Sequence, residues 1–151
     1  MIVNTKAFGR TEIDERQILN FPYGIFGFEN LTKYILLDSA QPPFYWLQSF
    51  DVREIAFVLI NPFLFKPDYN PLIPIDDYNK INLSIEDTEN ILIFSIVTIP
   101  EKSEDMTANL QGPILINKNN KQGIQSISTN IIYRVKHRIL EELSGVKDKV
   151  C

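Results

Sequence analysis

Reactive and metal-binding side chains are scarce in this sequence. Its 151 residues include one cysteine, Cys151, and one histidine, His137. One thiol cannot form an internal disulfide, and no cysteine pair is present to hold zinc. The patterns G-x-x-x-x-G-K-[ST], H-E-x-x-H and G-x-S-x-G are all missing. We therefore expect a protein that has no metal, no cofactor and no enzymatic activity.

Long apolar runs are also missing. The longest, around residues 55–60 and 91–99, are far too short to cross a bilayer as helices. The N-terminus lacks the basic segment and following apolar run of a signal peptide. Together with the lone cysteine, these absences predict a cytoplasmic protein that does not act on membranes.

The charge balance is mildly acidic. Lysine and arginine number 15 and aspartate and glutamate 19, which gives a formal net charge of −4. This argues against sequence-independent nucleic-acid binding, which needs a basic surface. An apolar content of 44% and the chain length fit one folded domain. We place that domain at residues 1–140 and expect a frayed or partly helical tail at 141–151.

The apolar pattern is mostly that of β-strands. Residues 90–99 make the strongest candidate, because they are β-branched and aromatic and are bounded by Asn90 and Pro100. Further candidates are residues 32–38, 44–50, 54–60, 113–117 and 123–128, the last two joined as a hairpin. Closely spaced strands without a confident helix predict an all-β fold, a single-domain antiparallel β-barrel-like structure with a short C-terminal strand or helical tail.

Other segments are irregular. Residues 21–28 contain Pro22, Gly24 and Gly27, which favour a bulged or looping segment over the core. Four prolines in residues 61–77 predict a long surface loop. We expect a short strand or one helical turn at 81–87 and a short strand at 131–135.

The aromatic segment 44–50 is the first candidate for binding. Its alternation places Phe44, Trp46, Gln48 and Phe50 on one face of a strand. These rings form either an aromatic core layer or, where exposed, a protein interface. A base-stacking role is weaker, because no lysine or arginine lies between Lys33 and Arg53.

The segment 106–117 is the second candidate. Thr107, Asn109 and Gln111 supply uncharged hydrogen-bonding groups, and Gly112-Pro113 forces a turn or bulge. Buried amides need partners, so such a run either fixes a backbone junction or contacts a binding partner.

Four motifs carry a family resemblance. They are GIFGFE at 24–29, PFYWLQS at 43–49, IVTIP at 96–100 and TANLQGPI at 107–114. In this order and spacing the chain resembles the flagellar assembly factor FliW family over about residues 2–138. Within the motifs we expect structural roles for Gly24, Gly27, Phe28, Thr107, Gly112 and Pro113.

The resemblance implies a small β-barrel-like protein that binds flagellin and the translational regulator CsrA. Free protein of this family relieves the repression that CsrA imposes on flagellin synthesis, and flagellin reverses this by occupying the protein. As partner-binding residues we expect Phe44, Trp46, Gln48 and Asn109, with no direct nucleic-acid contact. The alternative is a small β-barrel that binds single-stranded nucleic acid directly, with steep salt dependence. A hydrolase using Asp76, Asp105 or His137 is a third possibility.

Overall fold

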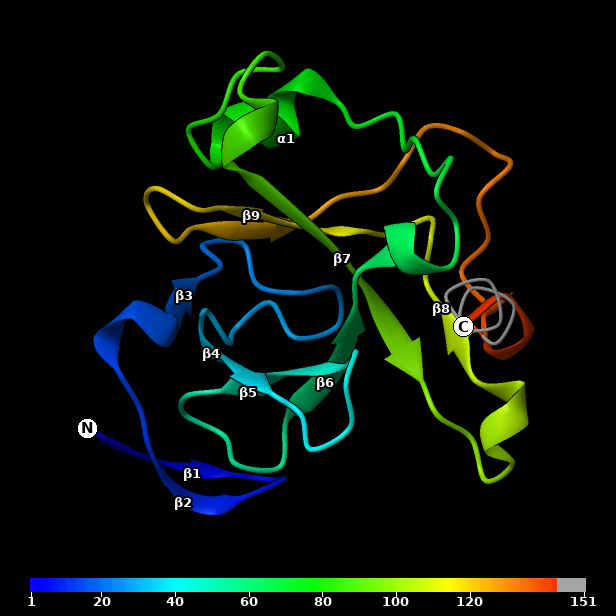
Figure 1. The fold of residues 1–151 in the computed structure, drawn as a ribbon. Helices are drawn as coiled ribbons and strands as arrows, with labels where there is room; N and C mark the ends of the chain where they lie inside the picture. The colour runs from blue at the N-terminus through cyan, green and yellow to red at the C-terminus, as the bar shows by residue number, and fades with distance from the viewer. Residues whose placement is uncertain (144–151) are drawn as a thin grey trace.

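The computed structural model describes residues 1–143, which fold into β-strands joined by turns and short helices (Figure 1). The strands are β1 Ile2–Thr5, β2 Gly9–Glu12, β3 Ile18–Asn20, β4 Lys33–Asp38, β5 Tyr45–Ser49, β6 Ala56–Ile60, β7 Ile91–Thr98, β8 Thr107–Ala108, β9 Ile114–Asn117, β10 Gly123–Gln125 and β11 His137–Arg138. The α-helix α1 spans Ile75–Lys80, and the 3₁₀ turns are η1 Glu15–Gln17, η2 Pro62–Leu64, η3 Thr88–Asn90 and η4 Ser103–Asp105.

The main sheet runs in the order β10-β9-β7-β6-β5-β4-β3, with every named ladder antiparallel. Its two ends approach each other, because Asn20, at the end of β3, bridges Gln122 just before β10. The Asn20 N–H donates to the Lys121 carbonyl at 2.9 Å. One bridge is not a ladder, so the sheet is curled rather than closed. The predicted all-β fold is confirmed, and "barrel-like" describes it loosely.

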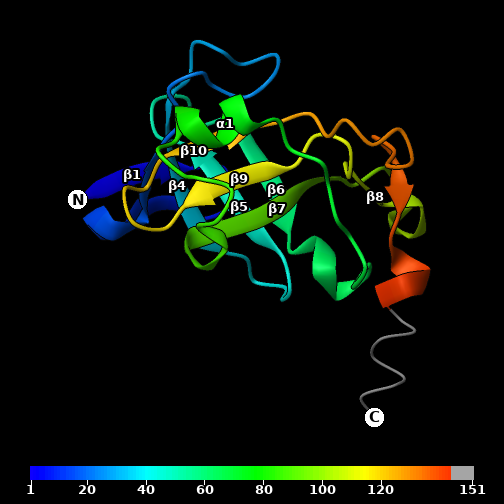
Figure 2. The same ribbon diagram turned by 90° about the horizontal axis from the view of Figure 1, so that it is seen from above.

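Strand β7 divides its hydrogen bonds among three neighbours. Its first half, Ile91 to Phe94, pairs with β9. From Ser95 to Val97 it pairs with β6, and its last two residues also pair with the short strand β8. Because β7 is eight residues long, one strand joins the β9–β10 hairpin to the β3–β6 meander. Figure 2 shows β7 crossing the molecule between these two groups.

The largest core cluster lies inside this curl. It contains the aromatic residues Phe21, Tyr34 and Phe94, packed with aliphatic side chains of β3, β5, β6 and β9. The Phe21 ring meets Tyr34 edge to face, with centroids 5.3 Å apart. Burial of each such ring contributes roughly 1.5–3 kcal/mol to stability. The looping segment 21–28 predicted over the core is therefore confirmed, since Phe21 and Ile25 anchor it there.

The hairpin β1–β2 forms a separate two-stranded sheet. It lies beside β4 and β5 (Figure 1) and packs Val3 and Ile13 against Ile35 and Leu37. The turn between its strands ends at Gly9, whose φ of +66° favours glycine. The hairpin thus brings a short exposed turn to the face of β5.

Residues 61–77 differ from the predicted surface loop. They contain η2 and the start of α1, and they bury Phe65, Tyr69 and Ile73 in two core clusters. Prolines rule out a ladder but not a helical first turn, and Pro74 stands at the N-cap of α1. The aromatic and aliphatic residues between the prolines are buried in the core, which the number of prolines alone did not indicate.

Two shorter predictions were wrong. Residues 81–87 form turns, neither a strand nor a helix, although Ile81 and Leu83 are buried. Residues 131–135 form no strand, and Ile131 is 94% exposed. The C-terminal strand is instead β11, which pairs with β8. Residues 140–143 are helical, as the tail prediction allows, and the remainder of the predicted tail lies outside the described residues.

Gly123 gives a test of the packing under Phe21. A Cβ added at Gly123 would lie 2.4 Å from Phe21 Cζ, so the ring must move. We expect Gly123→Ala to lower the free energy of unfolding by about 1–3 kcal/mol, the usual cost of overpacking a core. Urea denaturation measures this change. Combining it with Phe21→Leu should recover part of the loss, whereas additive losses would show that the two positions are not in conflict.

Two buried tyrosines give a matched comparison. The Tyr34 hydroxyl has no hydrogen-bond partner in the described structure, and burial raises the pKa of Tyr34 to about 12. The Tyr69 hydroxyl donates to the Leu110 carbonyl. We expect Tyr34→Phe to leave the free energy of unfolding unchanged or up to about 1 kcal/mol higher, and Tyr69→Phe to lower it by roughly 1–2 kcal/mol. Equal losses in urea titrations of the two variants would contradict this.

Candidate partner-binding surface

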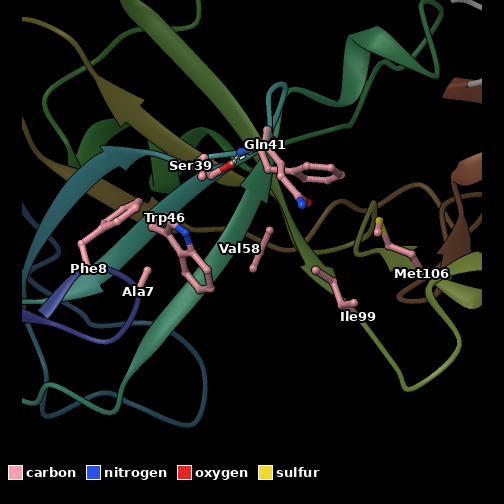
Figure 3. Close-up of a pocket in the computed structure, with 10 residues that line it drawn as sticks. Ala7, Phe8, Ser39, Gln41, Trp46, Val58, Ile99 and Met106 are labelled. Atoms are coloured by element: carbon pink, nitrogen blue, oxygen red, sulfur yellow. Dashed lines mark hydrogen bonds between the residues drawn. The ribbon is translucent and has the colours of Figure 1, made fainter.

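An apolar hollow of about 330 Å³ opens on one face of β5 and β6 (Figure 3). We call it the tryptophan hollow. None of its lining residues carries a charge: they are Ala7, Phe8, Ser39, Ala40, Gln41, Phe44, Trp46, Val58, Ile99 and Met106. They come from the β1–β2 turn, the β4–β5 loop, strands β5 and β6, and the chain around η4. A surface of this kind removes apolar area from water when a partner covers it.

The β4–β5 loop brings Phe44 to the hollow. The Ser39 hydroxyl donates to the Gln41 carbonyl at 2.8 Å, and the Gln41 N–H donates back to Ser39 Oγ at 2.9 Å. The Phe44 N–H donates to the Gln41 carbonyl at 3.2 Å across a cis bond between Pro42 and Pro43. Because this tight loop satisfies its own polar groups, it can stand beside the apolar surface.

Trp46 lies partly in the core and partly at the surface of the hollow. Its ring is half-buried and packs against the cluster around Ile35 and Leu37. It also lines the hollow, where Figure 3 shows it between Ala7 and Val58. Val58 is directly opposite Trp46 in the β5–β6 register. A ring held by the core on one side and open on the other is pre-organised for contact, since little side-chain entropy remains to be lost.

Gln48 lies beneath the surface rather than at the hollow. It is 1% exposed, and its Oε1 accepts from the Lys6 N–H at 2.9 Å. Its Nε2 donates to carbonyls of the β5–β6 turn, including Arg53 at 3.0 Å. The amide therefore joins that turn to the β1–β2 turn, whose next two residues, Ala7 and Phe8, line the hollow.

Asn109 lies apart from Phe44 and Trp46. It lines a smaller hollow of about 210 Å³ together with Phe26, Gln111, Gly112, Gln125, Ile127 and Val135. Its Oδ1 accepts from the Gly112 N–H at 2.8 Å, which fixes the turn before β9. The structure thus brings together two of the four predicted partner-binding residues and places Gln48 and Asn109 elsewhere.

Gln125 is the residue that the sequence reasoning missed. Its Oε1 accepts from the Phe26 N–H at 3.0 Å, and its Nε2 donates to the Gly112 carbonyl at 3.1 Å. One side chain thus joins the GIFGFE motif, at a residue 99 positions away, to the TANLQGPI motif, at a residue 13 positions away. A polar residue at an inward position of a predicted hairpin strand was the available signal, because a buried amide needs partners.

The residues with expected structural roles lie in turns and junctions. Gly24 and Gly27 have φ values of +69° and +89°, and a Cβ at Gly24 would lie 2.5 Å from Glu29 Cα. The Phe28 ring contacts Phe57 edge to face at 5.3 Å. Thr107, Gly112 and Pro113 lie in β8 and in the segment that connects it to β9. The motifs are therefore closely involved in the architecture.

Two of the three ionisable candidates are engaged in pairs, and the third, Asp76, is exposed in α1. His137 Nε2 lies 2.6 Å from Glu142 Oε1, and the imidazole stacks on Phe65. Asp105 pairs with Arg138 at 3.1 Å. Within residues 1–143, no three histidine, cysteine, aspartate or glutamate side chains gather to hold a metal ion. In the same part of the chain, no helix has the length and apolar character needed to cross a membrane.

Comparison with known proteins gives the family. The model of the FliW protein family matches residues 2–139. The chain belongs to the FliW family. A flagellar assembly factor FliW of Caldanaerobacter subterraneus subsp. tengcongensis is 48% identical over 147 residues, covering 96% of this chain and 97% of the relative. The FliW of Treponema denticola is 44% identical over 145 residues, with 96% and 97% covered.

A solved structure agrees with this assignment. The crystal structure of a flagellar assembly factor FliW superposes with a TM-score of 0.83 at 36% sequence identity. It covers 91% of this chain and 96% of the solved one. The FliW fold is therefore shared over nearly the whole chain, so this protein is a flagellar assembly factor of the FliW family.

The position of Gln48 generates a prediction. Gln48→Ala removes an amide that joins two turns, so we expect the free energy of unfolding to fall by about 1–3 kcal/mol. The Lys6 amide should also lose protection from hydrogen exchange, because its acceptor is gone. Gln41→Ala is the matched control, since the Gln41 side chain lies at the hollow and only its backbone is used in the loop. An unchanged Lys6 exchange rate in the Gln48 variant would contradict the assignment.

Proposed function

We propose that this protein binds flagellin and antagonises the translational regulator CsrA, so that flagellin level controls flagellin synthesis. Membership of the FliW family supports the flagellar role. The observation that carries the proposal further is the tryptophan hollow, an uncharged apolar surface with Phe44 and Trp46 among its lining residues. Aromatic side chains of this kind are enriched among residues that dominate protein interfaces.

The tryptophan hollow suits one face of an amphipathic helix. Terminal segments of flagellin are of that type when assembled, and such a helix docks by placing its apolar side chains in a groove. The hollow is lined by rings and aliphatic side chains, and its polar groups, from Ser39 and Gln41, lie in the loop at its edge. Phe8 and Ile99 are both substantially exposed, so a bound helix would cover area that otherwise faces water.

Antagonism of CsrA follows by exchange of partners. Protein occupied by flagellin is withdrawn from the pool available to CsrA, so the two equilibria are linked by mass action. The acidic charge of this chain suits a partner with basic surfaces, because complementary fields raise the association rate. In this proposal the protein acts in the cytoplasm, contacts no nucleic acid itself and catalyses no reaction.

Removing the aromatic anchor tests the proposal. We expect Trp46→Ala to weaken flagellin binding at least about tenfold, as truncation of an interface anchor does. Isothermal titration with purified flagellin and, separately, with CsrA measures both affinities. Phe8→Ser provides a second variant that leaves the core untouched, because Phe8 is an exposed residue of the β1–β2 turn.

Tyr23→Ala is the matched control for these measurements. Tyr23 is an exposed aromatic residue outside the tryptophan hollow, beneath Lys80. Its loss should leave both affinities unchanged. A folded Trp46→Ala protein that binds flagellin and CsrA as tightly as the unmodified chain would overturn the assignment of Trp46. Binding of neither partner by the unmodified chain would overturn the proposed function.

A further inference from the structure

The first half of β7 has an open edge. Ile91 to Phe94 pair with β9 on one side, whereas pairing with β6 begins only at Ser95. Strand β6 ends at Ile60, and the chain continues into η2, which lies near β7 but forms no ladder with it. The side of β7 that β6 would have covered is therefore left without a neighbouring strand.

The direction of the backbone groups follows from the register. The Lys118 N–H donates to the Asn90 carbonyl at 2.8 Å, so Asn90 faces β9. In an antiparallel ladder such residues alternate, which turns Leu92 toward β9 and Ile93 away from it. The hydrogen bonding at the other end of β7 gives the same alternation, because the Asn109 N–H donates to the Ile96 carbonyl on the β8 side. The odd-numbered residues of β7 thus face the β6 side.

Consequently, the N–H and C=O groups of Ile93 and the C=O group of Ile91 point outward from the open edge of β7, away from β9. Among residues 1–143, no side chain donates to or accepts from these groups, and no turn or loop hydrogen bond reaches Ile93. Unpaired strand edges of this kind are templates for another strand, and proteins cover them unless they are used.

A second hollow, which we call the edge hollow, lies against this strand. It has a volume of about 510 Å³ and is lined by five rings, Tyr45, Phe63, Tyr69, Tyr78 and Phe94, together with Asn61, Asn70, Pro71 and residues 91–93 of β7. Tyr45 points to the face of the sheet opposite Trp46, whereas Ile93 is on the same face as Trp46, so the edge hollow reaches both faces at the strand edge. It shares no lining residue with the tryptophan hollow. Backbone groups and rings together are the features that an added strand uses.

The chain segment that supplies most of the lining of the edge hollow is acidic, although no lining residue itself carries a charge. Residues 61–94, which supply most of its lining, contain six carboxylates and two lysines, a balance of −4 that equals the net charge of the whole chain. Both lysines already pair with carboxylates: Lys66 with Asp68 at 3.4 Å and Lys80 with Asp77 at 3.6 Å. This local field favours a partner segment that carries positive charge.

We propose that the edge of β7 binds an extended, lysine- or arginine-bearing segment of a partner protein, which adds to the sheet as a strand beside Ile91–Ile93. Backbone hydrogen bonds at Ile93 hold the segment, the rings of the edge hollow contact its side chains, and the acidic segment that lines the hollow selects its charge. This site does not rest on the proposed function, because the edge hollow shares no lining residue with the tryptophan hollow.

A capped peptide with alternating valine and threonine between lysine pairs serves as the probe. Titrated into the full ¹⁵N-labelled chain up to ~1 mM, it should shift the Ile93 amide resonance and slow its hydrogen exchange at least about tenfold. The same peptide N-methylated at its alternate amides cannot donate to the edge and should bind at least about tenfold more weakly. Raising the salt concentration should weaken the unmodified peptide further.

Two variants of one residue separate the backbone from the side chain. Ile93→Pro removes the edge-facing N–H without removing a ladder hydrogen bond, as proline at strand edges allows. It should weaken the peptide at least about tenfold, and Ile93→Ala, which keeps the N–H, less than about threefold. Equal weakening by both variants would overturn the proposal. So would equal binding of the N-methylated peptide or an unmoved Ile93 resonance at ~1 mM, and these two readouts need only the unmodified chain.

Discussion

The division of the β7 backbone among three strands is the constraint on which the rest of this structure depends. The first half of the strand holds β9, and the second half holds β6 and β8. Within residues 1–143, no other strand pairs with three partners. Strands β6 and β9 lie on opposite edges of β7, so one strand connects the β9–β10 hairpin to the β3–β6 meander. Because pairing with β6 begins only at Ser95, the edge of β7 beside Ile93 stays open.

Two buried amides hold the turns against this sheet. Gln48 joins the β1–β2 turn to the β5–β6 turn, and Gln125 joins the segment at Phe26 to the turn at Gly112. In each case one side chain satisfies a donor and an acceptor far apart in sequence. A buried amide with all partners present specifies one arrangement, because any alternative leaves polar groups unsatisfied. The shape of the tryptophan hollow depends in this way on a residue that does not line it.

The amino-acid sequence predicts the positions of the strands more accurately than the residues of the candidate binding surface. Residues 33–38, 45–49 and 91–98 are strands because apolar and β-branched residues recur there with little interruption. The pattern failed at 131–135, where only Tyr133 is buried and the remaining apolar side chains face outward. It also hid α1, since prolines before a helix look like prolines in a loop. Whether an apolar side chain is buried depends on contacts with segments distant in sequence, and apolar character alone does not determine those contacts.

The candidate surface was predictable in part for a similar reason. Alternation within one strand correctly put Phe44 and Trp46 on the same face, since that is a local property of the backbone. It gave Gln48 the same direction but could not show that the β1–β2 turn covers it. Asn109 depended on distances between strands, which no single segment contains. The Gln125 bridge was beyond prediction because its two partners lie 99 and 13 residues away.

The contact between Gly123 and Phe21 has an evolutionary consequence. The seam where the sheet's two ends approach leaves no room for a methyl group above the ring, so the two positions are bound to change together. Homologues that carry a side chain at the first site should carry a smaller residue at the second. A lineage that changed only one of the two residues would carry a less stable protein. The residue pair at these positions therefore reports how closely the two ends of the sheet approach each other in each relative.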